Sequence, residues 1–183
     1  MNFDHGDFTA FPKMARLSRE IIVTEKIDGT NAQVFISEDG TVRAGKRNGW
    51  ITPENDNFGF AEWVRDNEEC LRQPGPGRHF GEWWGAGIQR GYGLDHKRFS
   101  LFNVTRWGDS RPACCDVVPV MYRGPFCTGA VDQQLERLKE LGSFAARGFM
   151  KPEGVIVFHT AAGIGFKKTI EKDAVPKTLA GAA

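Results

Sequence analysis

Lys26 is followed two residues later by an acid and then at once by glycine, in the run TEKIDGTN (24–31). An apolar stretch, residues 21–23, precedes this run and predicts a strand that leads into it. Alternate side chains of a strand share a face, which places Lys26 and Asp28 together, and Gly29 permits a tight turn beside them. A partly buried lysine held near charged partners can act as a nucleophile. The run therefore predicts covalent chemistry at Lys26.

The composition indicates one globular domain. The 183 residues suffice for one sizeable core and are too few for two comfortable domains, while 40% hydrophobic and 26% charged residues are ordinary values. No apolar run is long enough to cross a bilayer, and residues 1–10 lack the basic and then apolar pattern of a signal peptide. We therefore expect a cytoplasmic protein with a single domain over 1–183.

The charge and the cysteines restrict the classes of site. The formal net charge is +1, so overall basicity does not indicate nucleic-acid binding, but basic residues gather in 43–47 and 167–177 and permit a local basic groove. None of the cysteines forms a C-x-x-C pair, which favours reduced structural thiols over a zinc site. The cysteines are Cys70, Cys114, Cys115 and Cys127.

Strands dominate the predicted elements. Apolar alternation predicts strands over 20–26, 31–36, 41–46, 79–84, 98–105, 117–122, 153–158 and 164–169. Asp39-Gly40 between two of them predicts a hairpin turn. The pattern as a whole favours one α+β domain rich in antiparallel sheet.

Two helices and three irregular segments complete the expected chain. Helical stripes lie at 60–71, where Asp56 or Asn57 is the start signal, and at 131–138, where Gly142 is the stop signal. Residues 74–77 and the glycine-rich stretch 85–93 are predicted loops. The chain after Lys172 is expected to be a frayed terminus.

Six motifs occur in an order that is specific when taken together, although a lone K-x-D-G is weak. They are EKIDGTN (25–31), KR (46–47), FGEW (80–83), FSLFNV (99–104), PEGVIV (152–157) and FKK (166–168). With them the chain resembles the ATP-dependent RNA ligases, within the covalent nucleotidyltransferase superfamily that also holds DNA ligases and mRNA capping enzymes. The resemblance covers about Phe11 to Lys177. It implies an ATP-grasp-like nucleotidyltransferase domain of two antiparallel sheets flanked by helices, with the nucleotide cleft between them.

The resemblance also implies a reaction in three steps. A lysine, here Lys26, attacks the α-phosphate of ATP, which gives lysyl-AMP and pyrophosphate. AMP then passes to a 5′-phosphate end of RNA, and a 3′-hydroxyl attacks that activated end and releases AMP. Such enzymes join or repair RNA ends and use Mg²⁺ or Mn²⁺, for which Glu153 is the implied ligand, because these ions prefer oxygen donors.

Catalytic roles are implied for Lys26, Asp28, Lys167 and Lys168. Ammonium groups near the α-phosphate would offset the charge that grows on its oxygens. Many relatives space their two lysines by one residue, whereas Lys167 and Lys168 are adjacent and should point to opposite faces of a strand. Lys167 is therefore the stronger candidate, and Lys168 could instead meet RNA or solvent.

Nucleotide binding is implied for a second set of residues, in which Arg47 would hold phosphates with two donors and Glu82 would accept hydrogen bonds from the ribose. Phe102 would stack on adenine, and Phe99, an odd number of residues away, would face the core. Asn103 stands where relatives often have an acid. The full set is Thr24, Glu25, Lys26, Ile27, Asn31, Arg47, Glu82, Phe102 and Lys167.

Ordinary structural roles compete with several of these. Asp28 could be a turn acid, Asn31 a polar strand residue and Glu82 a partner in a salt bridge across the sheet. The aromatic and basic residues of 83–98 could bind nucleic acid, or its tryptophans could be buried in the core. That segment contains Trp83, Trp84, Arg90, Tyr92, Lys97 and Arg98.

The expected partners are RNA ends with a 5′-phosphate and a 3′-hydroxyl, including those of a nicked duplex, and no membrane. We expect no C-terminal accessory domain, so an accessory protein could supply RNA binding. Two alternatives stay open from the sequence. One is a DNA ligase or a capping-type enzyme on the same scaffold, and the other is a binding module that has lost catalysis.

Overall fold

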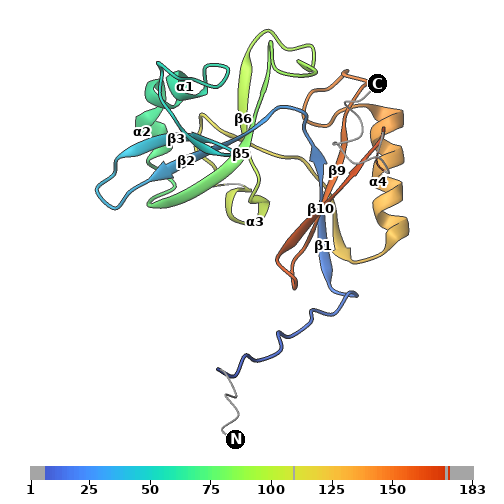
Figure 1. Cartoon of the computed structure of the whole chain (residues 1–183). Coiled ribbons are helices and arrows are strands. Elements are labelled where there is room, and N and C mark those ends of the chain that lie inside the picture. The colour runs from blue at the N-terminus through green and yellow to red at the C-terminus, as the bar shows by residue number, and fades with distance from the viewer. Residues whose placement is uncertain (1–6, 109, 172, 174–183) are drawn as a thin grey trace, which may run out of the picture.

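The chain passes from one β-sheet to a second immediately after Lys26, and this crossing organises the fold (Figure 1). The structure is a computed structural model that describes residues 7–108, 110–171 and 173. β1 (Glu20–Lys26) lies inside the first sheet and β2 (Thr30–Ile36) inside the second. Only residues 27–29 separate the two strands, so the two sheets are held close together at this point.

The first sheet has four antiparallel strands in the order β10-β9-β1-β8. Its other strands are β8 (Val120–Pro125), β9 (Gly154–His159) and β10 (Ile164–Thr169). One face buries β-branched residues such as Ile21 and Val155 against the helix α4 (Thr128–Leu141). The helix lies along the outer side of this sheet (Figure 1).

The second sheet has six strands in the order β4-β3-β2-β5-β6-β7. They are β4 (Gly49–Ile51), β3 (Val42–Lys46), β2, β5 (Gly77–Gly85), β6 (Lys97–Leu101) and β7 (Asp116–Val117). All neighbours are antiparallel except β6 and β7, which pair in parallel. The expectation of two purely antiparallel sheets is therefore wrong for this one pair.

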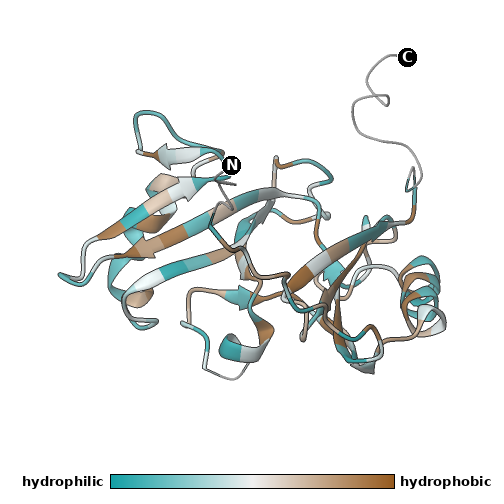
Figure 2. Cartoon of the chain, turned by 60° about the horizontal axis from the view of Figure 1, so that its bottom comes forward, coloured by the Kyte–Doolittle hydropathy of each residue, from teal (hydrophilic) through white to brown (hydrophobic). Residues whose placement is uncertain are grey.

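The six-stranded sheet has one buried and one open face. Hydrophobic and polar residues alternate along its strands, as half-buried strands require (Figure 2). On the buried face, Phe60 packs against Trp83 and Phe99 with ring centroids 5.3 and 5.0 Å apart. Phe60 begins α1 (Phe60–Asp66), which is followed by α2 (Glu68–Leu71). The Asp56 carboxylate accepts hydrogen bonds from the amides of Ala61 (2.7 Å) and Glu62 (3.0 Å), which confirms it as the start signal.

Most of the predicted elements are confirmed. The first strand coincides with its prediction, Gly40 turns the hairpin after β2 with φ 82°, and α4 ends at Gly142 with φ 77°. The loop 85–93 is also confirmed, and several of its residues have positive φ. The predicted chain end after Lys172 lies outside the described residues, apart from Asp173.

Two predicted strands were wrong and one strand was missed, each for a local reason. The strand predicted over 98–105 ends at Leu101, because the Asn103 side chain accepts the amide of Arg106 and starts α3 (Val104–Trp107). The strand predicted over 117–122 is divided at Pro119, and its two parts, β7 and β8, belong to different sheets. β4 was missed because three residues at a sheet edge are too short to show a period.

The cysteines are free thiols. The amide of Cys114 donates to the Cys70 sulfur at 3.3 Å, and contact with the Cys115 thiol together with burial raises the pKa of Cys114. Among the described residues there is no group of three or more His, Cys, Asp or Glu side chains that could hold a metal ion. No helix in the described part of the chain is long and apolar enough to cross a membrane.

The core between α4 and the first sheet yields a matched pair of variants. Leu138 is fully buried against this sheet, whereas Leu141 lies one turn further along the same helix and is exposed. We expect Leu138→Ala to lower the free energy of unfolding by about 2–5 kcal/mol, because it leaves a cavity. Leu141→Ala should change it by less than about 0.5 kcal/mol. Urea denaturation measures both, and equal effects would contradict the packing described here.

Candidate active site

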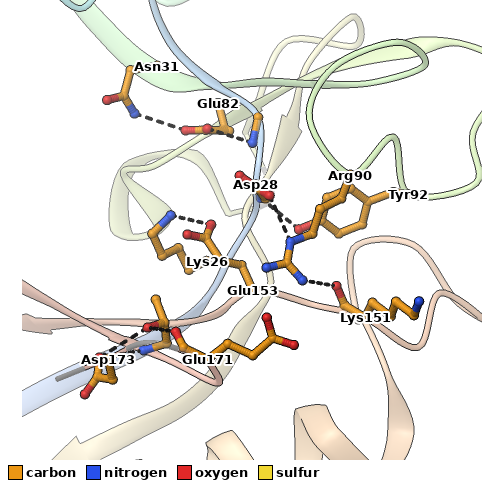
Figure 3. A network of polar contacts seen from close by, with 12 residues as sticks. Lys26, Asp28, Asn31, Glu82, Arg90, Tyr92, Lys151, Glu153, Glu171 and Asp173 are labelled. Carbon is orange, nitrogen blue, oxygen red and sulfur yellow. Dashed lines mark hydrogen bonds and ion pairs between the residues drawn. The ribbon is translucent and has the colours of Figure 1, made fainter. Parts of the chain in front are cut away.

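Lys26 ends β1 with its ammonium paired to the carboxylate of Glu153, the residue that immediately precedes β9 (Figure 3). The β1–β9 register places Lys26 opposite Gly154, which brings Glu153 beside it. The side chains are 22% and 14% exposed, so the pair is largely but not fully withdrawn from water. Sequence positions 127 residues apart thus form one charged centre.

A cavity of about 960 Å³ opens in front of this pair and is lined by both sheets. Strand alternation explains which residues of the first sheet face it, because Thr24 shares a face with Lys26, Ile156 lies opposite Thr24, and Lys167 lies opposite Ile156. The second sheet contributes several polar and aromatic residues. Those singled out from the sequence are Asn31, Arg47, Glu82 and Phe102.

Asp28 and Gly29 connect the two sheets at the edge of the cavity. A Cβ on Gly29 would lie 2.4 Å from the Trp83 carbonyl oxygen, so only glycine fits against β5 here. The Asp28 carboxylate pairs with Arg90 at 2.9 Å, and its backbone amide donates to the Tyr92 hydroxyl at 2.8 Å (Figure 3). Asp28 is therefore held by the glycine-rich loop, while the ammonium of Lys26 pairs with Glu153 instead.

Glu82 is a buried acid that connects the Gly29 turn with the start of β2. Its carboxylate accepts hydrogen bonds from the Gly29 amide and the Asn31 side-chain amide, both at 3.1 Å. Asn31 in turn accepts from Arg47, whose Nε lies 2.9 Å from the Asn31 oxygen. Burial raises the pKa of Glu82 to about 7, against the opposing influence of Lys26 and of these hydrogen bonds.

Glu25 lines the cavity but turns its carboxylate to the opposite side of β1. This buried carboxylate accepts hydrogen bonds from the Ser143 hydroxyl at 2.6 Å and from the amides of Phe144 and Ala145 at 2.8 and 2.9 Å. Burial raises its pKa. The implied nucleotide contact is therefore not available to the carboxylate in this arrangement. Ile27, implied in the same role, packs its buried side chain with Trp84 and Tyr92 while also bordering the cavity.

The adjacent lysines of β10 separate as strand geometry requires. Lys167 lines the cavity, whereas the Lys168 ammonium pairs with Asp132 on α4, on the other face of the sheet. The placement of Lys168 therefore does not support the catalytic contact that the resemblance implied. A one-residue spacing would have put both lysines on the cavity face.

The two phenylalanines of the fourth motif also separate. Phe99 is buried in the core, and Phe102 is 41% exposed and lines the cavity. Asn103, where relatives often carry an acid, caps α3 through its side chain and also borders the cavity.

The proposed nucleic-acid surface at 83–98 was wrong. Trp83, Trp84 and Tyr92 are only 2%, 1% and 2% exposed and belong to the core. Arg98 pairs with Asp116 at 2.7 Å. Burial of the tryptophans, the competing interpretation, is the one that the structure confirms.

Sequence reasoning missed several residues that border the cavity, among them two arginines and a phenylalanine. Arg78 and Phe80 precede Glu82 on the same face of β5, and Arg106 lies on α3. Counting back by twos from Glu82 would have found the first two, because β5 alternates regularly. Arg106 gave no signal, since the sequence predicted a strand up to residue 105 and no helix at this position.

Comparisons with known proteins agree with this arrangement. Solved structures of an RNA ligase from Naegleria gruberi share the fold. An apo aspartate-to-alanine mutant matches with a TM-score of 0.61 and 20% identity over 84% of this chain and 50% of that one. A lysine-to-alanine mutant with ATP and Mn has a TM-score of 0.60 and 18% identity over 83% and 49%. A lysine-to-methionine mutant with AMP and Mn has 0.58 and 18% over 84% and 50%.

The family is established by sequence. The RNA ligase family model matches residues 19–170, and the chain therefore belongs to the RNA ligase family. No curated protein matches the chain significantly. The chain spans about half the length of the solved ligases that it matches.

Glu82 should make the stability of the protein depend on pH, and its replacement by glutamine should remove this contribution. Its pKa is about 7 in the folded protein against an ordinary 4.5, so between these values the folded state holds the proton more tightly than the unfolded state. The contribution of Glu82 to stability is fully present below pH 4.5 and is lost as the pH rises to about 7. We expect the stability of Glu82→Gln relative to wild type to increase across this range. Thermal unfolding at several pH values measures this difference in stability, and Glu140→Gln, which alters an exposed acid, is the control. Parallel stability profiles for wild type and Glu82→Gln would contradict the burial of this charge.

Proposed function

We propose that this chain is an ATP-dependent RNA ligase that forms a covalent lysyl-AMP intermediate at Lys26. AMP would pass from Lys26 to the 5′-phosphate of an RNA end, which is then sealed to a 3′-hydroxyl with release of AMP. The observation that carries the proposal is the cavity wall itself. A partly buried lysine with a carboxylate beside it, a second lysine of the same sheet and an arginine of the other sheet surround one space large enough for a nucleotide.

The first step needs a neutral Lys26. While Lys26 is paired with Glu153, its ammonium has no lone pair, so it must give up a proton before it can attack. The nitrogen would then form a bond to the α-phosphorus as the bond from that phosphorus to the pyrophosphate oxygen breaks. Pairing with Glu153 holds the lysine side chain in place, and Lys167 and Arg47 supply positive charge toward the phosphates.

Other residues of the cavity fit the remaining parts of the nucleotide. Phe102 offers a half-exposed ring for an adenine to stack on, and Glu82 with Asn31 offers the polar groups that ribose hydroxyls would meet. Ribose hydroxyls would also give the buried Glu82 carboxylate further hydrogen bonds, which lowers the cost of its burial.

The donor set fits a divalent metal held largely by substrate. Glu153 supplies a carboxylate at the cavity, and ions such as Mg²⁺ need only one or two protein carboxylates when phosphate oxygens and waters complete the shell. When bound, the ion would offset the negative charge of the triphosphate. Glu153 would hold the ion with the same carboxylate that pairs with Lys26, so these two contacts would compete.

Membership of the RNA ligase family supports RNA as the substrate, and the solved Naegleria ligase complex with ATP and Mn supports ATP and a divalent metal. We therefore propose that this chain joins the ends of RNA. The choice of ATP over GTP, of RNA over DNA and of the joint is part of the same proposal.

The covalent step can be measured directly. After incubation with ATP and Mg²⁺ or Mn²⁺, intact-protein mass spectrometry should detect an adduct of one AMP on the wild type. The adduct should be absent from Lys26→Ala and present on Lys139→Ala, which alters an exposed lysine of α4. An adduct on Lys26→Ala would refute the nucleophile, and an adduct with GTP alone would identify a capping-type enzyme.

The two lysines of β10 give a second test. Lys167→Ala should slow AMP transfer to Lys26 by about 10²-fold or more, the usual effect of losing one group that stabilises charge in a transition state. Lys168→Ala should change the rate by less than about threefold, because its partner is the exposed Asp132. Rates of adduct formation under single-turnover conditions decide between them. Equal losses would restore Lys168 to the catalytic set.

A further inference from the structure

Beyond the cavity, the open face of the six-stranded sheet carries a group of side chains that the proposed reaction does not use. On β2 the residues Asn31, Gln33 and Phe35 point to this face, while the intervening Ala32 and Val34 are buried in the core. The register places Phe80 opposite Gln33 and Arg78 opposite Phe35. On the other side of β2, Gly45 of β3 lies opposite Gln33 and pairs with Trp50 of β4. We call this group the sheet platform, and its members are Gln33, Phe35, Trp50, Arg78 and Phe80.

The sheet platform is built around one guanidinium group. The Arg78 guanidinium carbon lies 5.0 Å from the ring centroid of Phe35 and 5.3 Å from that of Trp50, and the two rings are 5.7 Å apart. The Gln33 side-chain oxygen accepts a hydrogen bond from Arg78 at 3.2 Å. A Cβ on residue 45 would lie 2.8 Å from Gln33 Cγ, so Gly45 leaves the room that Gln33 occupies. These contacts hold the Arg78 guanidinium beside both aromatic rings, which are tilted by 53° to each other.

Large aromatic area stays accessible to solvent on the sheet platform. Trp50 is 44% exposed and Phe80 is 52% exposed, although an apolar side chain of this size is usually buried when it only supports a core. Part of each ring is therefore available to a further planar group. Exposed aromatic rings together with an arginine plane are the surface on which unpaired nucleic-acid bases stack.

Charge at the sheet platform has one predominant sign. Among the described residues, the ion pairs include neither Arg78 nor its neighbours Arg43 and Arg47. The adjoining hairpin carries two acids, Glu38 and Asp39, neither of which forms an ion pair among the described residues, and Asp39 is held by Ser37 and the Thr41 amide. Arginines without carboxylate partners beside exposed rings favour a polyanion over an apolar protein surface, since the centres of protein interfaces are depleted of charge.

The sheet platform is continuous with the cavity. Arg78 and Phe80 belong to both, and Asn31, which lines the cavity, is four residues from Phe35 along the same face of β2. At roughly 3.4 Å per residue, Phe35 lies about 14 Å from Asn31. An RNA strand whose end reacts at Lys26 would thus reach the sheet platform within a few nucleotides of the reacting phosphate.

We propose that the sheet platform binds a single-stranded segment of RNA next to the end that is to be joined. Bases stack on Trp50, Phe80 and the Arg78 plane, and the arginines contact phosphates. Recognition by stacking does not select a base, so the preference is for unpaired RNA of any sequence. The proposal rests on the proposed function, because it gives the RNA of that reaction a place on the chain.

Trp50→Ala is the central test, because Trp50 lies on the sheet platform and outside the residues that line the cavity. Fluorescence anisotropy would measure the affinity for a labelled oligoribonucleotide with a 5′-phosphate and no secondary structure. We expect about tenfold weaker binding, in line with the loss of one stacked base, and near-complete recovery in Trp50→Phe. AMP-adduct formation without RNA should keep its wild-type rate.

The chain provides a matched control on the other side of the molecule. Arg137 lies 5.3 Å from the ring centroid of Phe144 and donates to the Gln134 oxygen at 2.8 Å, the same kind of contact that Arg78 makes. Arg137→Ala should leave RNA affinity unchanged. Arg78→Ala should weaken it and reduce the slope of log affinity against log salt by about one, as the loss of one phosphate contact would.

The outcomes separate this proposal from the proposed function. Unchanged affinity in Trp50→Ala, or a fully paired duplex bound as tightly as the single strand, would overturn it. A shift of oligomeric state in Trp50→Ala with unchanged RNA affinity would also overturn it and assign the sheet platform to contact between copies. Weakened RNA binding would support it even in a protein that forms no AMP adduct, a result that would overturn the proposed function alone.

Discussion

The close approach of two sheets across residues 27–29 is the constraint on which the rest of the site depends. Because Gly29 has no Cβ, the chain can pass close to the Trp83 carbonyl oxygen, from which a Cβ at residue 29 would lie only 2.4 Å away. The same crossing puts Lys26 at the end of one sheet and Asn31 in the other. The motif of residues 25–31 thereby contributes to both walls of the cavity. Other motifs lie on strands that pair with it, such as β9 beside β1 and β5 beside β2.

The sequence predicted best where one strand decides the outcome. The strand that carries Lys26, the opposite faces of Lys167 and Lys168, and the separation of Phe99 from Phe102 all follow from alternation, which depends only on neighbours in the chain. The partners of the charged residues could not be obtained in this way. Glu153 beside Lys26 and Arg90 beside Asp28 are set by sheet register and by a loop, over separations of 127 and 62 residues.

Aromatic residues were the least predictable, because composition cannot distinguish a buried ring from a binding surface. Trp83 and Trp84 looked like a nucleic-acid surface beside basic residues, yet both belong to the core. Trp50, which attracted no attention in the sequence, lies exposed on an edge strand of three residues that was itself too short to predict. Trp83 and Trp84 lie on β5 inside the sheet, whereas Trp50 lies on its edge strand, and the order of the strands depends on pairing between distant parts of the chain.

Glu25 and Lys26 are neighbours that face opposite sides of β1, and this restricts how the proposed nucleophile can move. The Glu25 carboxylate is bound to one hydroxyl and two backbone amides in the interior, so a displacement of the strand would have to break three buried hydrogen bonds at once. The backbone beneath Lys26 is therefore stiff. Any adjustment of the Lys26 nitrogen between its ion pair and the proposed attack is left to the four-carbon side chain and to the nucleotide. Glu25 would thus hold the backbone for the proposed reaction while its own carboxylate lies on the other side of the strand.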